Sequence, residues 1–192
     1  MIAGRIGYRL RQFWSALYAR PSGGDLEKVS SLLTPAQMAL FRQMHRSEQA
    51  HSIQVMRAVS QASQGIPDEP RTELLKAALL HDVGKSRFPV RIWERAVIVL
   101  GKAFLPGQVK RWGGGQPSGE GQPSGEEQPS GWRRAFIVAQ QHPAWGAQMA
   151  EAAGASPLAA ALIRRHQDGP PNPGGDLEDR LLQLLQAADH EL

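Results

Sequence analysis

The fold of this chain is constrained most by a series of helix start and stop signals with no strand pattern between them. At 34–35 and 156–157, a Thr or a Ser stands directly before a proline, as an N-cap stands before the first residue of a helix. Gly84 and Gly154 follow apolar runs, where glycine is typical of a helix end. No segment has the strict apolar–polar alternation of a half-buried strand. These signals predict an all-α fold.

The helical periodicity also gives approximate bounds for the elements. We expect a loop with a short helix at 21–33, after which Thr34 begins one long helix that continues to about residue 63. Pro143 is interpreted as the first residue of a helix that Gly154 ends, and Asp176 as the cap of the last helix. The remaining predicted helices cover about 71–82, 90–105, 132–142 and 156–166.

The low-complexity segment 113–131 contains the tetrapeptide QPSG three times and no large apolar residue. Such a segment cannot offset the entropy of ordering itself, so it predicts a flexible insertion that joins helices of one domain. We therefore divide the chain into 1–33, an N-terminal helix with a linker, and 34–192, the main domain with this insertion.

The first 20 residues predict an amphipathic helix, because Ile6, Leu10, Phe13 and Leu17 recur at helical spacing among several arginines. Two interpretations remain open: the helix packs on the main domain or a second subunit, or it lies on an anionic membrane surface. No apolar run approaches the ~18 residues of a membrane span, and no secretory signal is recognisable. We expect a cytoplasmic protein, with peripheral contact at the inner membrane surface as the alternative.

The composition limits the chemistry that the chain can perform. It has no cysteine, so disulfides, thiolate zinc sites and cysteine nucleophiles are excluded. A metal ion would have to be held by His, Asp or Glu, a ligand set that suits Mn, Fe, Ni, Zn or Mg. The net charge of +4, without a basic patch, gives no strong signal for nucleic acid.

Four histidines and two aspartates stand where predicted helices face inward or end. His51 shares a helix face with Val55 and Val59, and Asp189 continues the apolar stripe of Leu185. The set consists of His51, His81, Asp82, His142, His166 and Asp189. A hydrogen bond in the core or at a helix end would account for any one of them alone. Six together predict coordination of one or two divalent cations, because buried imidazoles and carboxylates are costly without partners.

The order of these residues resembles a known family. His51, the doublet His81–Asp82 and Asp189 resemble the H…HD…D signature of the HD-domain metal-dependent phosphohydrolases. "LLHDVGK" at 79–85 is similar to the HDIG form of the doublet. "HPAWG" and "IRRHQD", which contain His142 and His166, fall where HDIG and HD-GYP domains carry further histidines. The resemblance covers about residues 34–192. It implies an HD-domain helical bundle that hydrolyses a nucleotide or a related phosphate ester.

The resemblance also implies roles for single residues. The first metal ion would be bound by His51, His81, Asp82 and Asp189. A second ion would be bound by Asp82, His142 and His166. Lys85 matches the lysine that faces the substrate phosphate in HD-GYP proteins, although a solvated surface lysine is the alternative. Asp82 and Lys85 are thus the expected catalytic residues, and the cofactor is one or two divalent metal ions.

Three departures from the family pattern limit what the resemblance implies, and two of them, Gln167 and the segment 168–173, motivate a second hypothesis. Gln167 stands where HD-GYP domains usually have the second of two paired histidines. Ser47 takes the place of a glutamate in three-metal relatives, and the adjacent Glu48 is rotated from that helix face by about 100°. The segment 168–173 matches the GYP motif only faintly. The alternative is a degenerate HD-type signalling module that binds metal and a nucleotide or a protein partner without turnover.

Overall fold

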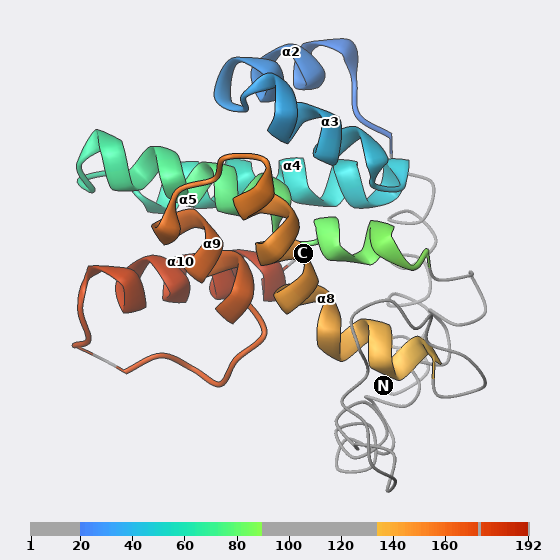
Figure 1. Cartoon of the computed structure of the whole chain (residues 1–192). Helices are drawn as coiled ribbons and strands as arrows, with labels where there is room; N and C mark the ends of the chain where they lie inside the picture. Colours follow the sequence, from blue (N-terminus) through green and yellow to red (C-terminus); the bar gives the residue numbers. More distant parts are fainter. Residues whose placement is uncertain (1–19, 90–133, 173, 192) are drawn as a thin grey trace, which may run out of the picture.

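The computed structural model describes residues 20–89, 134–172 and 174–191, and every regular element within these ranges is a helix (Figure 1). The elements are α2 (Gly23–Leu32), α3 (Pro35–Gln43), α4 (Arg46–Ala62), α5 (Asp68–Leu80), the 3-10 helix η1 (Val83–Arg87), α8 (Arg134–Ala152), α9 (Pro157–Arg165) and α10 (Leu177–Glu191). The predicted all-α fold is confirmed. The predicted N-terminal helix, the helix at 90–105 and the insertion at 113–131 lie outside the described residues.

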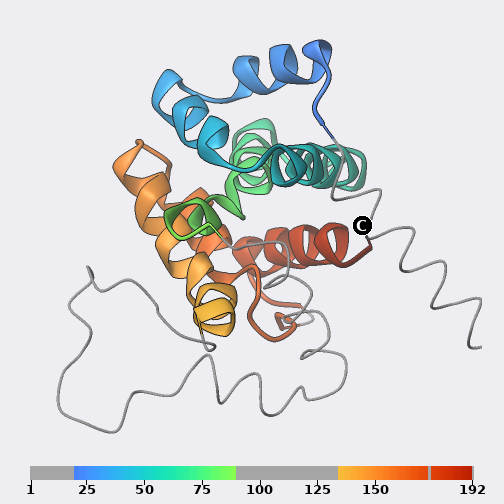
Figure 2. The ribbon, with the colours of Figure 1, turned by 90° about the vertical axis from the view of Figure 1, so that its right-hand side faces the viewer.

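The central helix of the arrangement is α5, which packs against α4 on one side and α9 on another. Helix α8 packs along α9 and η1, and α10 contacts both α4 and α9 (Figure 2). Helices α2 and α3 lie together on an outer side of the bundle, where both contact α5 and α3 also reaches η1 and α8 (Figures 1 and 2). None of the described helices is long and apolar enough to cross a membrane.

The hydrophobic core surrounds the C-terminal half of α5. Leu74, Leu79 and Leu80 are fully buried there, together with Leu162 of α9 and Leu185 of α10. Burial of each such side chain contributes about 1.5–3 kcal/mol to folding. Because α5 runs through this core and ends at Leu80, the next two residues, His81 and Asp82, leave the helix in the interior of the protein.

The predicted single helix over 34–63 is wrong, because α3 ends at Gln43 and α4 begins at Arg46. Met44 and His45 between them have extended backbone conformations. The side chains around the break satisfy the groups that it exposes: the Glu48 carboxylate accepts from the His45 N–H at 3.0 Å, and Gln49 donates to the Met44 carbonyl at 2.9 Å. Local capping thus offsets the loss of helical hydrogen bonds.

The prediction that Pro143 begins a helix is wrong, because Pro143 lies inside α8. The segments 132–142 and 143–153 were therefore predicted as two helices where the structure has one, from Arg134 to Ala152. Gly154 does end this helix: its φ of +76° is the left-handed conformation of a helix C-terminus, and the Ala155 N–H donates to the Ala150 carbonyl at 2.9 Å.

Gly84 was predicted to end a helix, but it lies within η1, and its φ is not positive. Its glycine identity is explained by close packing of η1 on α8. A Cβ atom at Gly84 would overlap the His142 carbonyl and lie 2.6 Å from the Gly146 backbone nitrogen. Gly146 is buried at the same contact, with its own Cβ position 3.2 Å from the Gly84 nitrogen. These two glycines bring the His81–Asp82 turn against α8.

Gly84→Ala should destabilise the protein by about 1–3 kcal/mol or more, because the methyl group would have to displace the backbone of α8. Gly24→Ala in α2 is the matched control, since a Cβ there meets nothing within 4 Å and alanine favours a helix. Urea unfolding of both variants in EDTA measures the effect without any metal contribution. Equal midpoints for Gly84→Ala and the wild type would contradict the close packing.

Candidate metal centre

All six predicted ligand residues converge in the interior of the bundle, although they come from five different places in the chain. Three stand at or beside helix ends, because His81 and His166 follow the last residues of α5 and α9, and Asp82 precedes η1. The other three project from within helices α4, α8 and α10: they are His51, His142 and Asp189. The six form two groups of three in which the ligand atoms lie within 4.8 Å of one another.

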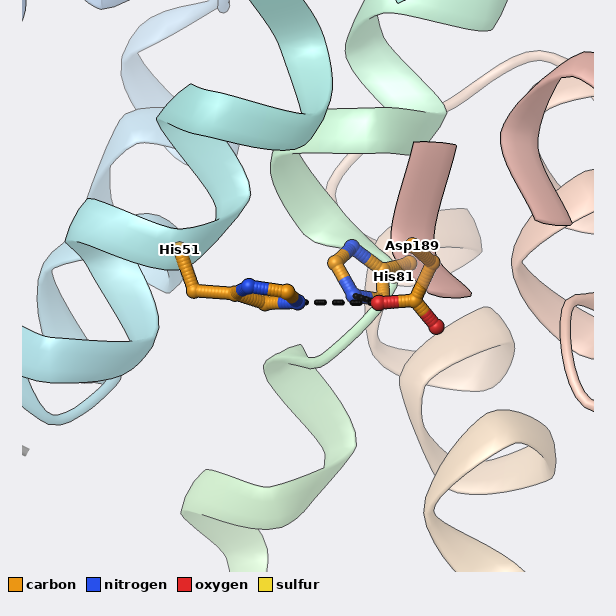
Figure 3. Close-up of side chains that lie close together, drawn as sticks. All are labelled: His51, His81 and Asp189. Atoms are coloured by element: carbon orange, nitrogen blue, oxygen red, sulfur yellow. Dashed lines mark hydrogen bonds and ion pairs between the residues drawn. The ribbon is translucent and has the colours of Figure 1, made fainter. Parts of the chain in front are cut away.

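The first group contains His51, His81 and Asp189, whose side chains converge from α4, the end of α5 and α10 (Figure 3). The Asp189 Oδ1 atom lies 2.8 Å from His51 Nε2 and 3.4 Å from His81 Nε2. The side chains of His51 and Asp189 are 28% and 21% exposed, whereas His81 is buried. This group therefore faces the solvent side of the site.

The second group, Asp82, His142 and His166, is buried throughout. The Oδ1 atom of Asp82 lies 3.4 Å from His142 Nε2, and the Nε2 atoms of His142 and His166 are 3.3 Å apart. Asp82 Oδ1 is also 3.7 Å from His81 Nε2, which belongs to the first group. Asp82 Oδ1 thus lies near a histidine of each group.

Main-chain carbonyls fix the orientation of the three buried imidazoles. The Nδ1–H groups of His81, His142 and His166 each donate to the carbonyl three residues earlier in the chain, at 2.9, 3.0 and 2.7 Å. A carbonyl can only accept, so each ring carries its proton on Nδ1 when neutral. The unprotonated Nε2 atoms then point into the site, as is usual for histidines that bind metal ions.

This arrangement fits a divalent cation better than it fits internal hydrogen bonding. With protons on both Nδ1 atoms, the facing Nε2 atoms of His142 and His166 are two acceptors without a hydrogen between them. His81 Nε2 is buried and has no hydrogen-bond partner. An orphaned buried nitrogen is costly in a native protein unless an ion or a water satisfies it. The residues present therefore fit metal binding.

The charges of the site agree with this assignment. Burial by itself would raise the pKa of Asp82, but Lys85 and His81 outweigh burial and hold that pKa well below its usual value. Burial likewise opposes ionisation of Asp189, but the hydrogen bond from His51 and the nearby His81 ring keep the pKa of its carboxyl group below the usual value. Both aspartates are thus ionised at neutral pH and available as anionic ligands.

The imidazoles differ from one another. Burial lowers the pKa of His142, and burial together with the neighbouring His81 and His142 lowers the pKa of His166 to about 3. Both rings are neutral at pH 7 and keep the Nε2 lone pair that a metal ion needs. Burial also disfavours charge on His81, but Asp82 and Asp189 outweigh it and raise the pKa of His81. Positive charge is therefore most favourable at the position between these two carboxylates.

Lys85 donates from Nζ to the second oxygen of Asp82, Oδ2, at 2.6 Å, and its side chain is partly exposed. Burial opposes its charge, but Asp82 outweighs burial and raises the pKa of Lys85. Lys85 is therefore an ammonium group on the rim of the site. Asp82 in turn uses Oδ2 for Lys85 and presents Oδ1 to the histidines.

Pro143 has a role at this site that the sequence analysis missed. A proline has no N–H, so the carbonyl four residues earlier, that of Ala139, receives no helical hydrogen bond from it. His142 Nδ1 donates to this same Ala139 carbonyl at 3.0 Å. Pro143 therefore removes a competing donor from the carbonyl that orients its neighbour. The adjacency of a histidine and a proline inside an apolar helix was the signal that could have revealed this.

Glu48 is a second residue that sequence reasoning placed away from the site. It is only 9% exposed, and its charge is among those that raise the pKa of Lys85. The neighbouring Ser47 lies against His45, whose Nδ1 is 2.8 Å from the Ser47 Oγ. The sequence analysis placed Glu48 away from the site from its rotation about the helix axis alone. That argument did not include Lys85, which approaches Glu48 from η1.

Fold and site together define the class: an all-α protein whose core contains a cluster of histidines and aspartates suited to divalent metal ions. The family model for the HD domain matches residues 49–107. This segment of the chain is therefore similar to the HD domain, and the match covers less than half of the chain. The match includes His51, His81 and Asp82, whereas His142, His166 and Asp189 lie beyond it. Neither the comparison with curated proteins nor the comparison with solved structures gave a match.

The two ligand groups predict a specific pattern of metal stoichiometry. The wild type should bind two Mn²⁺ ions, and both His51→Ala and His166→Ala should bind one, because each substitution removes a ligand from one group. Elemental analysis after dialysis and calorimetric titration measure the stoichiometry. His190→Ala is the control, since His190 is exposed on α10 and belongs to neither group. Two ions in His166→Ala would contradict the second group.

The low pKa of His166 also predicts a pH dependence of stability. His166 binds a proton in the unfolded chain near pH 6.5 but in the folded protein only near pH 3, so its contribution to stability is lost as pH falls below about 6.5. Between pH 7 and pH 5 this loss is about 2 kcal/mol for one proton. In EDTA, the free energy of unfolding of His166→Gln should therefore fall by about 2 kcal/mol less than that of the wild type between pH 7 and pH 5. Identical pH dependences for the two proteins would show that His166 accepts protons freely when folded.

Proposed function

We propose that this protein is a metal-dependent phosphohydrolase or phosphodiesterase that acts on a nucleotide or a related phosphate ester. The observation that carries the proposal is the pair of facing ligand groups, with Asp82 Oδ1 near a histidine of each, in a chain with a segment similar to the HD domain. Two cations close to one another suit in-line displacement at phosphorus, because they lie beside both the attacking and the leaving oxygen.

The residues support this chemistry in distinct ways. His51, His81 and Asp189 would hold one ion and Asp82, His142 and His166 the other. Ions held there would polarise the phosphate ester and lower the pKa of a bound water. Asp82, which is ionised, would keep one oxygen directed at the histidines of both groups.

The protein also offers a positive group for the substrate. Lys85 is the ammonium on the rim of the site, 2.6 Å from the Asp82 carboxylate. From this position it would donate to a phosphate oxygen and offset part of the negative charge that develops during the reaction. Its hydrogen bond to Asp82 restricts the side chain before a substrate binds. This pre-orientation reduces the entropy that is lost on binding.

The alternative function is a signalling module of HD type that binds metal and a nucleotide or a protein partner without turnover. One structural observation favours it: the Asp82 Oδ2 atom is already engaged by Lys85. A carboxylate that keeps this bond would have one oxygen left for metal ions. Nucleotide binding by the metal-loaded protein, without hydrolysis across a broad panel of nucleotides, would support the module and contradict the enzyme.

The proposed activity predicts metal-dependent hydrolysis of bis-p-nitrophenyl phosphate that is abolished by EDTA. Asp82→Asn should lower kcat at least about 100-fold, because the neutral amide removes the charge shared by both ligand groups. Lys85→Met should raise KM about 10-fold or more with unchanged metal content, since it removes a charge-assisted hydrogen bond to phosphate.

Lys28→Met is the matched control for Lys85→Met, because Lys28 is exposed on α2 and far from the site in sequence. It should leave kcat, KM and metal content unchanged. If wild type loaded with Mn²⁺ or other divalent ions hydrolyses no phosphate ester, the proposed enzyme is wrong even where the metal centre is right.

A further inference from the structure

Gln186 of α10 is a buried polar residue that the proposed reaction does not use. It is 7% exposed and lies on the core-facing stripe of α10 between Leu182, Leu185 and Asp189. The sequence pattern favours an apolar side chain there, as at the neighbouring leucines. A buried amide needs partners, so its hydrogen bonds show what it does.

Both partners of the Gln186 amide belong to the turn that carries His166. Nε2 donates to the Arg165 carbonyl at 3.3 Å and to the Asp168 carbonyl at 3.2 Å. These carbonyls stand on either side of His166 and Gln167, at the end of α9, where helical hydrogen bonds run out. The turn is closed on its own side by the Asp168 N–H, which donates to the Arg165 carbonyl at 2.9 Å.

Within the described residues, no regular element lies between the end of α9 and the start of α10. After His166 the chain passes through "QDGPPNPGGD", ten residues rich in glycine and proline, before α10 begins. Side-chain contacts at two places connect the end of α9 to α10. At the start of α10, Arg165 donates to Glu178 at 2.6 Å and to Asp179 at 2.8 Å. Near its other end, Gln186 holds the carbonyls around His166.

We propose that Gln186 is a positioning residue for the buried metal-ligand group, because it fixes the backbone of His166 from the helix that carries Asp189. It acts through the turn and does not touch the ligand atoms. The inference rests on the metal centre of the proposed function. Its consequence is that α10 serves both groups: Asp189 is a ligand in one, and Gln186 supports a ligand of the other.

Two single-site backgrounds test this positioning role. His51→Ala leaves the Asp82, His142 and His166 group intact, and His166→Ala leaves the His51, His81 and Asp189 group intact. In the His51→Ala background, adding Gln186→Leu should weaken Mn²⁺ binding about 10–100-fold, the usual effect of removing a residue that orients a ligand. In the His166→Ala background, the same change should alter the Mn²⁺ affinity by no more than about 2-fold, much less than the loss expected in the His51→Ala background.

The exposed Gln183 of the same helix provides the matched control. Gln183→Leu should leave Mn²⁺ affinity unchanged in both backgrounds. A second readout needs no metal: in the metal-free protein, Gln186→Leu should speed hydrogen exchange of the His166 Nδ1–H, which donates to Ile163, relative to that of His142. Faster exchange at His166 alone supports positioning.

The outcomes separate this inference from the proposed function. Equal loss of Mn²⁺ affinity in both backgrounds, or loss in neither, would overturn the positioning role, because Gln186 would then be a structural residue only. If the wild type itself binds no Mn²⁺, the metal centre is wrong and the inference is overturned with it. If the wild type binds two ions but hydrolyses nothing, the expected split between the backgrounds still supports Gln186 as a positioning residue.

Discussion

The site depends on three hydrogen bonds from buried imidazoles to main-chain carbonyls. Each of His81, His142 and His166 donates from Nδ1 to the carbonyl three residues before it, so that Nε2 is directed away from its own helix. Such carbonyls are open only where helical hydrogen bonding is interrupted. At His81 and His166 the helix ends, and at His142 the proline that follows has no N–H to donate. The same local property, an interrupted helix, therefore orients all three rings.

This requirement explains much of the surrounding architecture. A helix that ends inside a protein exposes carbonyls that must find donors, and a histidine at the last position supplies one from its own ring. The chain that follows the His81–Asp82 doublet then passes close to the backbone of α8. Gly84 permits this approach, since any side chain there would overlap α8 at His142. The glycine after the doublet and the proline after His142 are thus parts of one contact.

Much of the site was predictable from sequence because its residues are marked by helix ends. His81 and Asp82 follow an apolar run, where a charged or polar residue is conspicuous, and His166 stands at the end of a helix. His51 and Asp189 share the period of buried residues. The structure places these residues together with His142, as predicted, although it divides them into two groups with Asp82 in the second. The metal-binding and catalytic roles of these residues remain predictions.

The errors have a common physical origin. The break at Met44 and His45 was missed because both residues suit a helix locally, and only the Glu48 and Gln49 side chains make the interruption favourable. Pro143 was assigned to a helix start because that is where an isolated proline is tolerated best. In each case a side chain compensates a backbone group, and which side chain will do so depends on partners that periodicity does not identify.

Gln186 extends this argument to long range. Its place in an apolar stripe is visible in the sequence, but its partners lie 18 and 21 residues earlier, across a glycine- and proline-rich turn. An amide suits this place because its two hydrogens can reach two carbonyls at once, whereas a hydroxyl has one hydrogen and a carboxylate has none. The residue type thus follows from the need to hold His166 without a regular element beneath it. One helix can then provide a ligand of one group and support a ligand of the other.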